Sequence, residues 1–333
     1  MLYANANANA NANANANANA NANANADPAA PTRELAAAMT EIARQMGELG
    51  PAEVLADGVD ALVVRVGEIV VKAHSADTDL AALRARLRVA GSPELRSAAL
   101  GPLPVDGEVV LSQAGRLITV WPYGGPVDPD HPDAAPWESA ARLLATLHAT
   151  PITHRRDLPV AGGPARVHRA MRRLRDAGHI VDATPAAVVW RAFDSLPELV
   201  CAPESLVHGD FHLGQLVCAA PGEWRLIDFD DLGLGDPAWD LARPAAFYAA
   251  GILEPVAWTR LLTAYRAAGG AAVAPGGDVW ATLDLPARAV VVQAAALVVA
   301  TGRPLDELDT ALVDACLRIA DTPITEQIPS AVG

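Results

Sequence analysis

The sequence predicts an α+β protein in which a small lobe with an antiparallel sheet precedes a larger, mainly helical lobe. Short β-rich runs lie between residues 54 and 121 and are separated by turns such as Asp57-Gly58. Segments with apolar residues at helical spacing fill most of the chain after residue 136. A stretch rich in Gly and Pro, residues 124–136, separates the two patterns. A change of hydrophobic period across such a stretch indicates a lobe boundary.

The chain begins with a low-complexity segment. Residues 4–26 alternate Ala and Asn, and all 11 Asn of the protein lie there. A segment without sizeable apolar side chains cannot form a core. It is either a natural flexible tail or a feature added for expression, and it carries no weight in the fold. We therefore predict a tail over 1–30, a small lobe over 31–124 and a large lobe over 125–333.

The small lobe is predicted to start with a helix over 34–49, which Gly50-Pro51 ends. A second helix is predicted over 80–89, where apolar residues again recur at helical spacing. The predicted strands are 54–55, 61–66, 69–71, 109–112 and 117–121. Because tight turns connect them, they are expected to form an antiparallel meander and a hairpin.

The large lobe is predicted to be helical except at residues 205–230. The predicted helices are 137–149, 164–177, 185–193, 237–251, 255–268, 279–301 and 305–320. In the exception, three β-rich pieces (206–207, 215–218 and 224–227) surround polar residues. Polar side chains at strand ends are typical of active sites in mixed α and β folds, so we place the candidate site here.

Composition limits the classes of partner. The net charge is −14 and the isoelectric point is about 4.9, which gives no overall basic surface for nucleic acid or an anionic membrane. The three cysteines show no C-x-x-C spacing, which favours a reducing, cytoplasmic location. The most apolar run, 289–300, is too short to cross a bilayer and is expected to be a buried helix. The N-terminus lacks the pattern of a secretory signal.

The candidate site contains the residue types that phosphoryl transfer needs. The segment 205–230 contains His208-Gly209-Asp210. Gln215 follows Asp210 by five residues, and Asp228 follows Gln215 by thirteen. Phosphoryl transfer uses a carboxylate that orients the attacking hydroxyl, oxygen ligands for Mg²⁺, and a fixed cation on the phosphates. The spacing therefore indicates Asp210 as the catalytic base and Gln215 with Asp228 as metal ligands.

These motifs carry a family resemblance. The H-G-D segment with Gln215, followed by Ile227-Asp228-Phe229-Asp230, resembles the aminoglycoside phosphotransferase family, small-molecule kinases related to protein kinases. The segment G-D-P-A-W-D-L-A at 235–242 and L-H-A at 147–149 also match, and the likeness spans about residues 50–320. The form H-G-D-x-H-x-G-Q is similar to the maltokinase and glucosamine kinase branch. The resemblance implies a bilobal, protein-kinase-like fold.

The resemblance also implies a nucleotide site in the small lobe. Lys72, the only lysine beside 24 arginines, ends a β-rich run where the family's ATP-phosphate lysine lies. Trp121 and Tyr123 fall at the hinge and would flank adenine, with ordinary core packing as an equal alternative. Glu94 is the candidate acidic partner of Lys72, and Asp79 is the alternative. The turn at 57–60 has one Gly and lacks the G-x-G-x-x-G pattern.

Four residues are candidate contacts for the acceptor molecule: His212, Asp230, Asp231 and Glu254. The three acidic residues would suit amines. His212 could instead be a solvated loop residue, and Asp230 could support the metal from outside its ligand shell. Asp236 and Asp240 are expected to cap the helix near Pro237 and to brace the loop. The arginines in 166–175 are expected to form a solvated helix face.

The sequence thus predicts an ATP- and Mg²⁺-dependent phosphotransferase that modifies a hydroxyl of a small molecule. The acceptor would be a sugar, an amino sugar or an aminoglycoside-type antibiotic, and GTP is an alternative donor. Two other interpretations stay open, namely a non-catalytic kinase-like nucleotide-binding protein and a kinase for an unrelated small alcohol. No nucleic-acid or membrane partner is expected, and the sequence does not set the oligomeric state.

Overall fold

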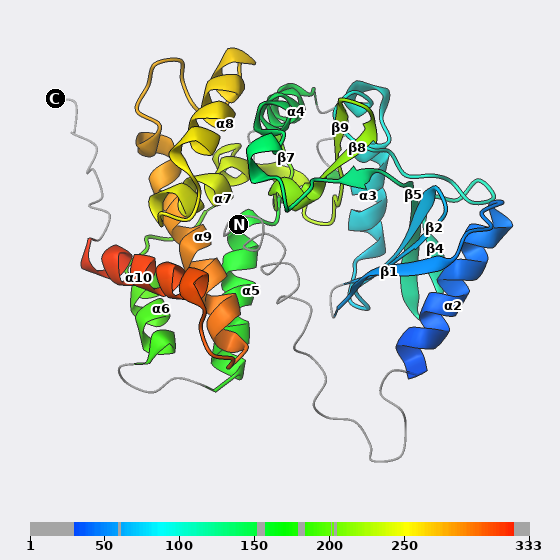
Figure 1. Cartoon of the computed structure of the whole chain (residues 1–333), viewed down its shortest axis with the longest axis horizontal. Coiled ribbons are helices and arrows are strands. Elements are labelled where there is room, and N and C mark those ends of the chain that lie inside the picture. The colour runs from blue at the N-terminus through cyan, green and yellow to red at the C-terminus, as the bar shows by residue number, and fades with distance from the viewer. Residues whose placement is uncertain are drawn as a thin grey trace.

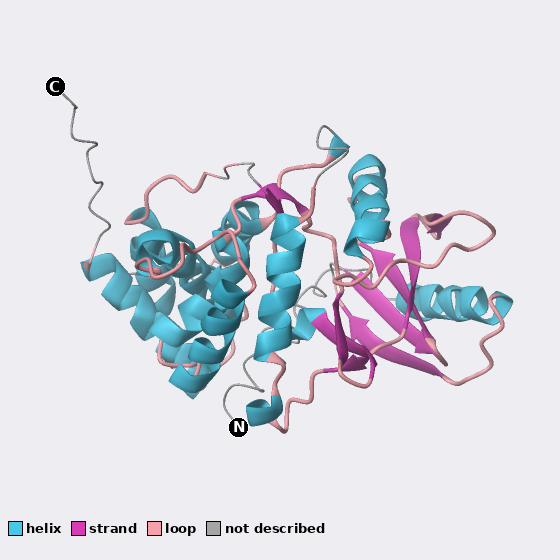
Figure 2. Cartoon of the chain, turned by 90° about the horizontal axis from the view of Figure 1, so that it is seen from above, coloured by secondary structure: helices cyan, strands magenta, loops and turns pink. Residues whose placement is uncertain are grey.

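The computed structural model describes residues 30–58, 61–151, 157–178, 184–200, 202 and 205–322. The Ala-Asn repeat and residues 59–60 of the turn at 57–60 lie outside them. The chain forms two parts that lie side by side, a sheet with its helices at one end and a group of helices at the other (Figure 1). Figure 2 shows the same division from above, with most strands at one end.

The N-terminal part is built on a five-stranded antiparallel sheet in the order β1-β2-β3-β5-β4. The strands are β1 (Ala52–Asp57), β2 (Ala61–Val66), β3 (Ile69–His74), β4 (Leu111–Gln113) and β5 (Arg116–Pro122). Helix α2 (Ala30–Gln45) packs on one face, where Leu35 and Met39 join an apolar core with Val71. The helix ends before residue 49 because Gly47 adopts a φ of 95°, a left-handed conformation that terminates helices.

The opposite face of this sheet carries the polar residues that matter for the site. In the β3–β5 pairing, Lys72 lies opposite Thr119 and Val70 lies opposite Trp121. Side chains alternate along a strand, so Lys72 and His74 share one face of β3 while Val71 points into the core with α2. That face looks toward the rest of the chain.

Helix α3 (Leu80–Ala90) follows β3, and its first turn is capped by Asp79, whose side chain accepts a hydrogen bond of 2.7 Å from the amide of Ala82. A short turn of 3₁₀ helix, η1 (Pro93–Leu95), comes next. The chain then pairs with the C-terminal part, because the amide of Leu226 donates to the carbonyl of Ala98 at 2.8 Å. This pairing ties the two parts of the molecule together.

The C-terminal part contains all seven helices predicted from the sequence, each within about two residues at either end. They are α4 (Trp137–Ala149), α5 (Gly163–Asp176), α6 (Pro185–Asp194), α7 (Ala238–Ala249), α8 (Pro255–Ala267), α9 (Trp280–Ala300) and α10 (Glu307–Asp321). Helix α9 packs against α5, α6, α7 and α10. It is the one described helix long and apolar enough to cross a membrane, but 67% of its most apolar window is buried, as in a core helix.

Two small sheets position the loops of the C-terminal part. One contains β6 (Gly125–Pro126), β8 (Leu216–Ala220) and β9 (Glu223–Leu226), and the other pairs β7 (Ser205–Val207) with β10 (Gly233–Gly235). The sequence did not predict β6 and β10, which are two- and three-residue strands rich in Gly. Strand β6 follows the predicted lobe boundary and pairs with β8 rather than with the large sheet. The division at residue 124 stays a prediction.

The pairing of β7 with β10 decides where the motifs meet. Val207 lies opposite Gly233, so the loop that starts at His208 runs beside the segment 227–232 that precedes β10. These two segments are separated by about twenty residues in the chain, and the antiparallel pairing brings them together. The H-G-D and I-D-F-D motifs therefore face each other at the junction of the two parts.

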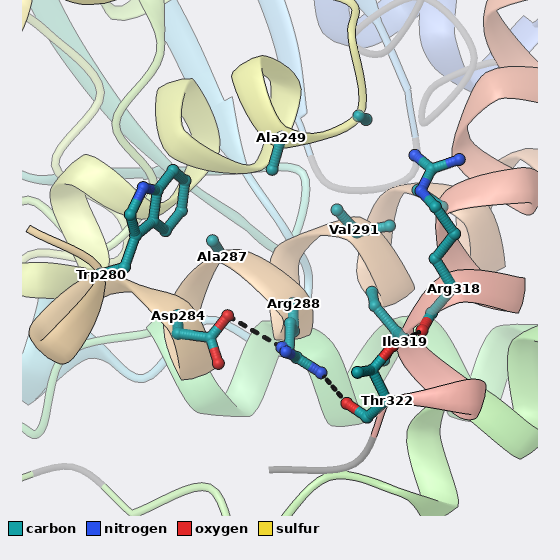
Figure 3. Close-up of a pocket in the computed structure, with 11 residues that line it drawn as sticks. Ala249, Trp280, Asp284, Ala287, Arg288, Val291, Arg318, Ile319 and Thr322 are labelled. Atoms are coloured by element: carbon teal, nitrogen blue, oxygen red, sulfur yellow. Dashed lines mark hydrogen bonds and ion pairs between the residues drawn. The ribbon is translucent and has the colours of Figure 1, made fainter.

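A separate cavity lies among the C-terminal helices (Figure 3). Its volume is about 170 Å³, and residues of α7, α9 and α10 line it together with Ala250 and Thr322. Within it, Arg288 donates to Asp284 at 2.9 Å and also to the carbonyl of Thr322. The residues that line this cavity do not include those of the H-G-D and I-D-F-D motifs.

Candidate active site

A buried polar chain holds the H-G-D loop from behind. Asp240, on α7, accepts hydrogen bonds from the amide of His208 at 2.6 Å and from the amide of Gly209 at 2.8 Å. His148, on α4, lies 2.9 Å from the same carboxylate, and its other ring nitrogen is 2.7 Å from the hydroxyl of Tyr265. Burial tends to raise the pKa of Asp240, but the hydrogen bond and charge of His148 hold it below its usual range. Asp240 thus braces the loop as predicted, whereas Asp236 accepts from an amide at the start of α7.

Gly209 permits the loop to lie against the I-D-F-D-D segment. Its φ is 83°, and a Cβ at this position would lie 2.2 Å from the carbonyl oxygen of Asp231. That oxygen also accepts a hydrogen bond of 3.0 Å from the amide of Gly162. Any larger residue at 209 would separate the loop from Asp231, so the glycine of the motif is required by a close approach of two backbones.

Asp210, the predicted catalytic base, is held by two arginines. Arg166 from α5 lies 2.8 Å from its Oδ2, and Arg243 from α7 lies 2.9 Å from its Oδ1. Burial raises the pKa of Asp210, while the two arginines oppose this rise. The two ion pairs fix the orientation of the Asp210 carboxylate at the junction of the two parts.

Sequence reasoning missed both arginines. It placed Arg166 and Arg169 on a solvated helix face, yet Arg166 also pairs with Asp231 at 2.7 Å and Arg169 pairs with Asp231 at 3.1 Å. The prediction is therefore wrong for Arg166, which is half-buried between Asp210 and Asp231, whereas Arg169 is exposed as predicted and reaches Asp231 from the surface. The sequence could have indicated Arg243 as a site residue. It follows Asp240 by three residues and so lies on the adjacent turn of the same predicted helix, α7.

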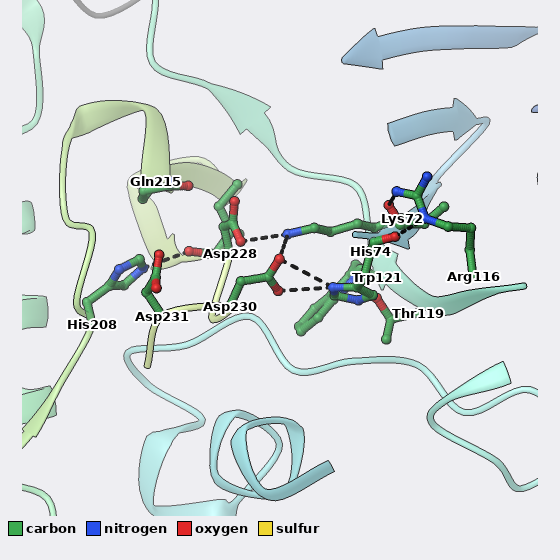
Figure 4. Close-up of polar contacts among 12 residues, drawn as sticks. Lys72, His74, Arg116, Thr119, Trp121, His208, Gln215, Asp228, Asp230 and Asp231 are labelled. Atoms are coloured by element: carbon green, nitrogen blue, oxygen red, sulfur yellow. Dashed lines mark hydrogen bonds and ion pairs between the residues drawn. The ribbon is translucent and has the colours of Figure 1, made fainter. Parts of the chain in front are cut away.

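The two predicted metal ligands lie close together. Figure 4 shows the side chain of Gln215, in the short turn η4 (Leu213–Gln215), pointing toward Asp228. His212 is buried, and its Nε2 lies 3.1 Å from the amide nitrogen of Gln215, which leaves the amide oxygen for a cation. An amide and a carboxylate oxygen suit Mg²⁺, which completes its shell with water and phosphate oxygens. These residues fit the predicted ion.

Asp228 has an unusual backbone. Its φ is 60°, in the left-handed region that residues other than Gly seldom adopt. The preceding carbonyl, that of Ile227, accepts a hydrogen bond of 2.8 Å from the ring of His208. Such strain is typical of functional sites, where the surrounding structure maintains it. His208 therefore organises the turn on which Asp228 lies.

Lys72 joins the N-terminal sheet to this turn. Its Nζ lies 2.6 Å from Asp228 and 2.9 Å from Asp230 (Figure 4). Burial lowers the pKa of Lys72, but the two aspartates outweigh burial and raise it above its usual value. Burial likewise favours the neutral form of Asp230, whereas Lys72 and His74 hold its pKa well below the ordinary range. Lys72 and Asp230 are therefore both charged at neutral pH.

His74 was not predicted as a site residue. It is 1% exposed, with Nδ1 3.1 Å from Asp230 and Nε2 2.8 Å from the hydroxyl of Thr119. The same hydroxyl accepts a hydrogen bond of 2.9 Å from the indole of Trp121. Strand periodicity could have found His74, because it lies two residues after Lys72 and shares its face.

The remaining predicted nucleotide contacts differ in their surroundings. Glu94 is exposed on η1, and the ion pairs of Lys72 among the described residues are with the two aspartates instead. Trp121 is buried, with its ring 6.2 Å from that of Phe229. Tyr123 is half-buried, and the guanidinium of Arg65 stacks 3.3 Å over its ring. Contact of Trp121 and Tyr123 with adenine stays a prediction.

The predicted acceptor contacts are largely occupied. Asp230 is paired with Lys72, and Asp231 with Arg166 and Arg169. His212 is only 3% exposed and contacts Gln215 instead of an open surface. Glu254 is exposed immediately before α8, and within the described residues no hydrogen bond or ion pair joins its side chain to this network. The structure thus brings three of the four together and leaves Glu254 outside.

Comparison with solved structures supports the fold. The choline/ethanolamine kinase family protein from Mesorhizobium loti is 19% identical, with a TM-score of 0.55 over 88% of this chain and 96% of that one. Choline kinase LicA from Streptococcus pneumoniae is 14% identical, with a TM-score of 0.57 over 86% and 99%. Spectinomycin phosphotransferase APH(9)-Ia, in complex with ADP and spectinomycin, is 14% identical, with a TM-score of 0.53 over 85% and 97%. The expected kinase-like α+β fold is confirmed.

Sequence comparison then assigns the family. No curated protein sequence matches the chain significantly. The model of the phosphotransferase enzyme family, APH, matches residues 51–284, a range that contains Lys72, Asp210, Gln215 and Asp228. Since the match covers more than half of the chain, this protein belongs to the APH phosphotransferase family.

Proposed function

We propose that this phosphotransferase moves the γ-phosphoryl group of ATP to a hydroxyl of a small molecule, with Mg²⁺ bound by Gln215 and Asp228. One observation carries the proposal. Lys72 on β3 and Asp228 after β9 are 156 residues apart in sequence and 2.6 Å apart in space. This contact lies at the junction of the two parts, beside Asp210 and its arginines. The arrangement supplies a base, a phosphate cation and oxygen ligands in one place.

In the proposed reaction, Asp210 orients the acceptor hydroxyl and takes its proton as the hydroxyl oxygen attacks the γ-phosphorus. The new P–O bond forms while the bond to the bridging oxygen of ADP breaks. The Lys72 ammonium holds the phosphates of the donor, and the two arginines keep the carboxylate of Asp210 in place. Mg²⁺, when bound, would neutralise charge on the phosphates.

The acceptor class is a finer part of the proposal. The form His208-Gly209-Asp210-Phe211-His212-Leu213-Gly214-Gln215 supports a sugar or amino sugar, by its likeness to the maltokinase and glucosamine kinase branch. A non-catalytic nucleotide-binding protein is the second candidate. It is favoured by one feature, that arginines occupy both carboxylate oxygens of Asp210.

A phosphoryl-transfer screen tests both candidates. The full chain is incubated with Mg²⁺ and ATP or GTP and with amino sugars, maltose-like sugars, aminoglycosides and nucleoside antibiotics, and ADP or GDP release and product mass are measured. We expect acceptor-dependent release that Asp210→Asn abolishes. Mg²⁺-dependent nucleotide binding without any phosphorylated product would support the non-catalytic alternative, and acceptor-dependent release with GTP only would replace ATP as the donor.

A further inference from the structure

Arginines from three helices surround the candidate base Asp210 and its neighbour Asp231. Arg166 and Arg169 on α5 and Arg243 on α7 pair with Asp210 or Asp231. Arg86 on α3 donates from Nε to the carbonyl of Leu232 at 2.9 Å, one residue after Asp231. Four cations thus adjoin two carboxylates. In a chain whose net charge is −14, this is a local concentration of positive charge.

The carboxylates beside Asp210 already form ion pairs with cationic side chains. Asp231 pairs with Arg166 and Arg169, and it is only 16% exposed. Asp230 pairs with Lys72 at 2.9 Å. An amine on the acceptor would therefore meet carboxylates that already pair with fixed positive charge, which is unfavourable in a partly buried site.

Two arginines on one face of α5 have capacity for a further anionic partner. Arg166 and Arg169 are three residues apart, so they are neighbours on the helix surface. The Nε of Arg166 is buried and has no hydrogen-bond partner among the residues that the structure describes. The side chain of Arg169 is 47% exposed, and Asp231 holds it on one side at 3.1 Å. A planar guanidinium matches two oxygens of a carboxylate or phosphate.

We propose that the acceptor carries an anionic group, a carboxylate or a phosphate, which Arg166 and Arg169 bind beside Asp210. This inference rests on the proposed function and specifies its acceptor. When the anionic group engages Arg166, the Oδ2 atom of Asp210 is released from its ion pair while Arg243 keeps Oδ1. The released oxygen then accepts the proton of the acceptor hydroxyl. Binding of the correct acceptor thereby completes the base.

Binding calorimetry on the full chain with ADP and Mg²⁺ tests the charge preference on two scaffolds. The hexose series is glucose, glucosamine, glucuronate and glucose 6-phosphate, and the three-carbon series is glycerol, serinol, glycerate and glycerol 3-phosphate. We expect an anionic member of at least one series to bind tenfold or more tightly than its neutral and cationic counterparts. Comparison of the two anions in a series distinguishes a carboxylate site from a phosphate site.

Variants locate the binding to the arginines. Arg169→Gln is expected to lower the affinity for the anion about tenfold, the effect of one charge-assisted hydrogen bond, and to leave the affinity for ADP unchanged. Arg166→Lys keeps the positive charge but removes the planar guanidinium that can donate two parallel hydrogen bonds, so it should also lower the affinity for the anion. Arg175→Gln is the matched control, because Arg175 is exposed on the same helix and pairs with its neighbour Asp176 at 3.2 Å.

Three results would overturn the inference: neutral or cationic members binding as tightly as the anions, no anion binding in either series, or Arg169→Gln weakening ADP instead of the anion. The proposed function fails separately. Phosphorylation of neutral or cationic acceptors that is insensitive to Arg169→Gln would keep the proposed function and remove the anionic acceptor. Arginine-dependent anion binding without phosphoryl transfer to any bound anion would keep the anion site and remove the proposed function.

Discussion

His148 and Asp240 form a hydrogen bond of 2.9 Å between two side chains that are completely buried. The bond joins α4 to α7, and the carboxylate of Asp240 continues to the amides of His208 and Gly209. The loop that presents Asp210 is therefore held by groups behind it, in the interior of the helical part. A buried network of this kind is rigid when all its members are satisfied.

Asp240→Asn is expected to lower the free energy of unfolding by about 3 kcal/mol at pH 7, because it breaks a buried charged network. The pKa of Asp240 lies below its usual range in the folded protein. Its contribution is thus fully present above the unfolded pKa of about 3.9 and is lost as pH falls through the folded value. Urea unfolding of the wild-type protein and of Asp240→Asn should show that their difference in the free energy of unfolding becomes smaller below pH 4. An equal difference at all pH values would contradict this; Asp176→Asn, an exposed change, is the control.

Gly209→Ala tests the close approach of the two loops. We expect a loss of stability of about 3 kcal/mol or more, since the new Cβ would lie 2.2 Å from the carbonyl oxygen of Asp231. Gly222→Ala is the matched control, because Gly222 has a φ of 79° and, within the described part of the chain, no further atom lies within 4 Å of its added Cβ. It should cost roughly 1 kcal/mol, from backbone strain alone. Equal losses in thermal unfolding would show that the contact is unimportant.

Asp210→Asn should reduce turnover about 10²- to 10⁴-fold, the usual contribution of a positioned base. The amide retains the volume of the side chain but cannot accept the hydroxyl proton. The fold should persist, which circular dichroism and thermal unfolding can check. Retention of the rate in a coupled assay would remove Asp210 from its proposed role.

Lys72→Met is expected to weaken productive use of ATP, with kcat/KM for ATP reduced by about 100-fold, the effect of about 2.7 kcal/mol of lost phosphate binding. The change also leaves Asp228 and Asp230 without their shared cation. Steady-state kinetics with varied ATP provide the measurement. Arg84→Gln, an exposed change on α3, is the control, and an unaltered kcat/KM in Lys72→Met would argue against a phosphate role.

Gln215→Asn shortens the amide arm by one methylene and tests the proposed metal site. The apparent Mg²⁺ constant for phosphoryl transfer should rise about tenfold, because the shorter side chain cannot reach the same position while Asp228 remains. Titration of activity with Mg²⁺ at saturating ATP measures this. Removal of Mg²⁺ with a chelator should abolish transfer in both proteins, and an unchanged Mg²⁺ dependence in the variant would exclude Gln215 as a ligand.

Local patterns sufficed for the elements and for the residues of the motifs. Apolar spacing predicted α4 to within a residue, and β-rich runs predicted β2 and β3. These features depend on neighbours a few residues apart, which a sequence displays directly. Lys72 is the only lysine beside 24 arginines, and it ends a β-rich run. Both observations can be made from the sequence alone.

Only the tertiary structure decided which charges meet. The sequence offered Glu94 as the partner of Lys72, but the fold supplies Asp228 and Asp230, 156 and 158 residues away. It also turned Arg166 from an expected solvated residue into a partner of Asp210. Ion pairs of this range follow from how helices and sheets pack, and residue spacing along the chain does not encode that packing. The sequence by itself therefore determined the family and the residues of its motifs, while packing decided which charged side chains surround Asp210.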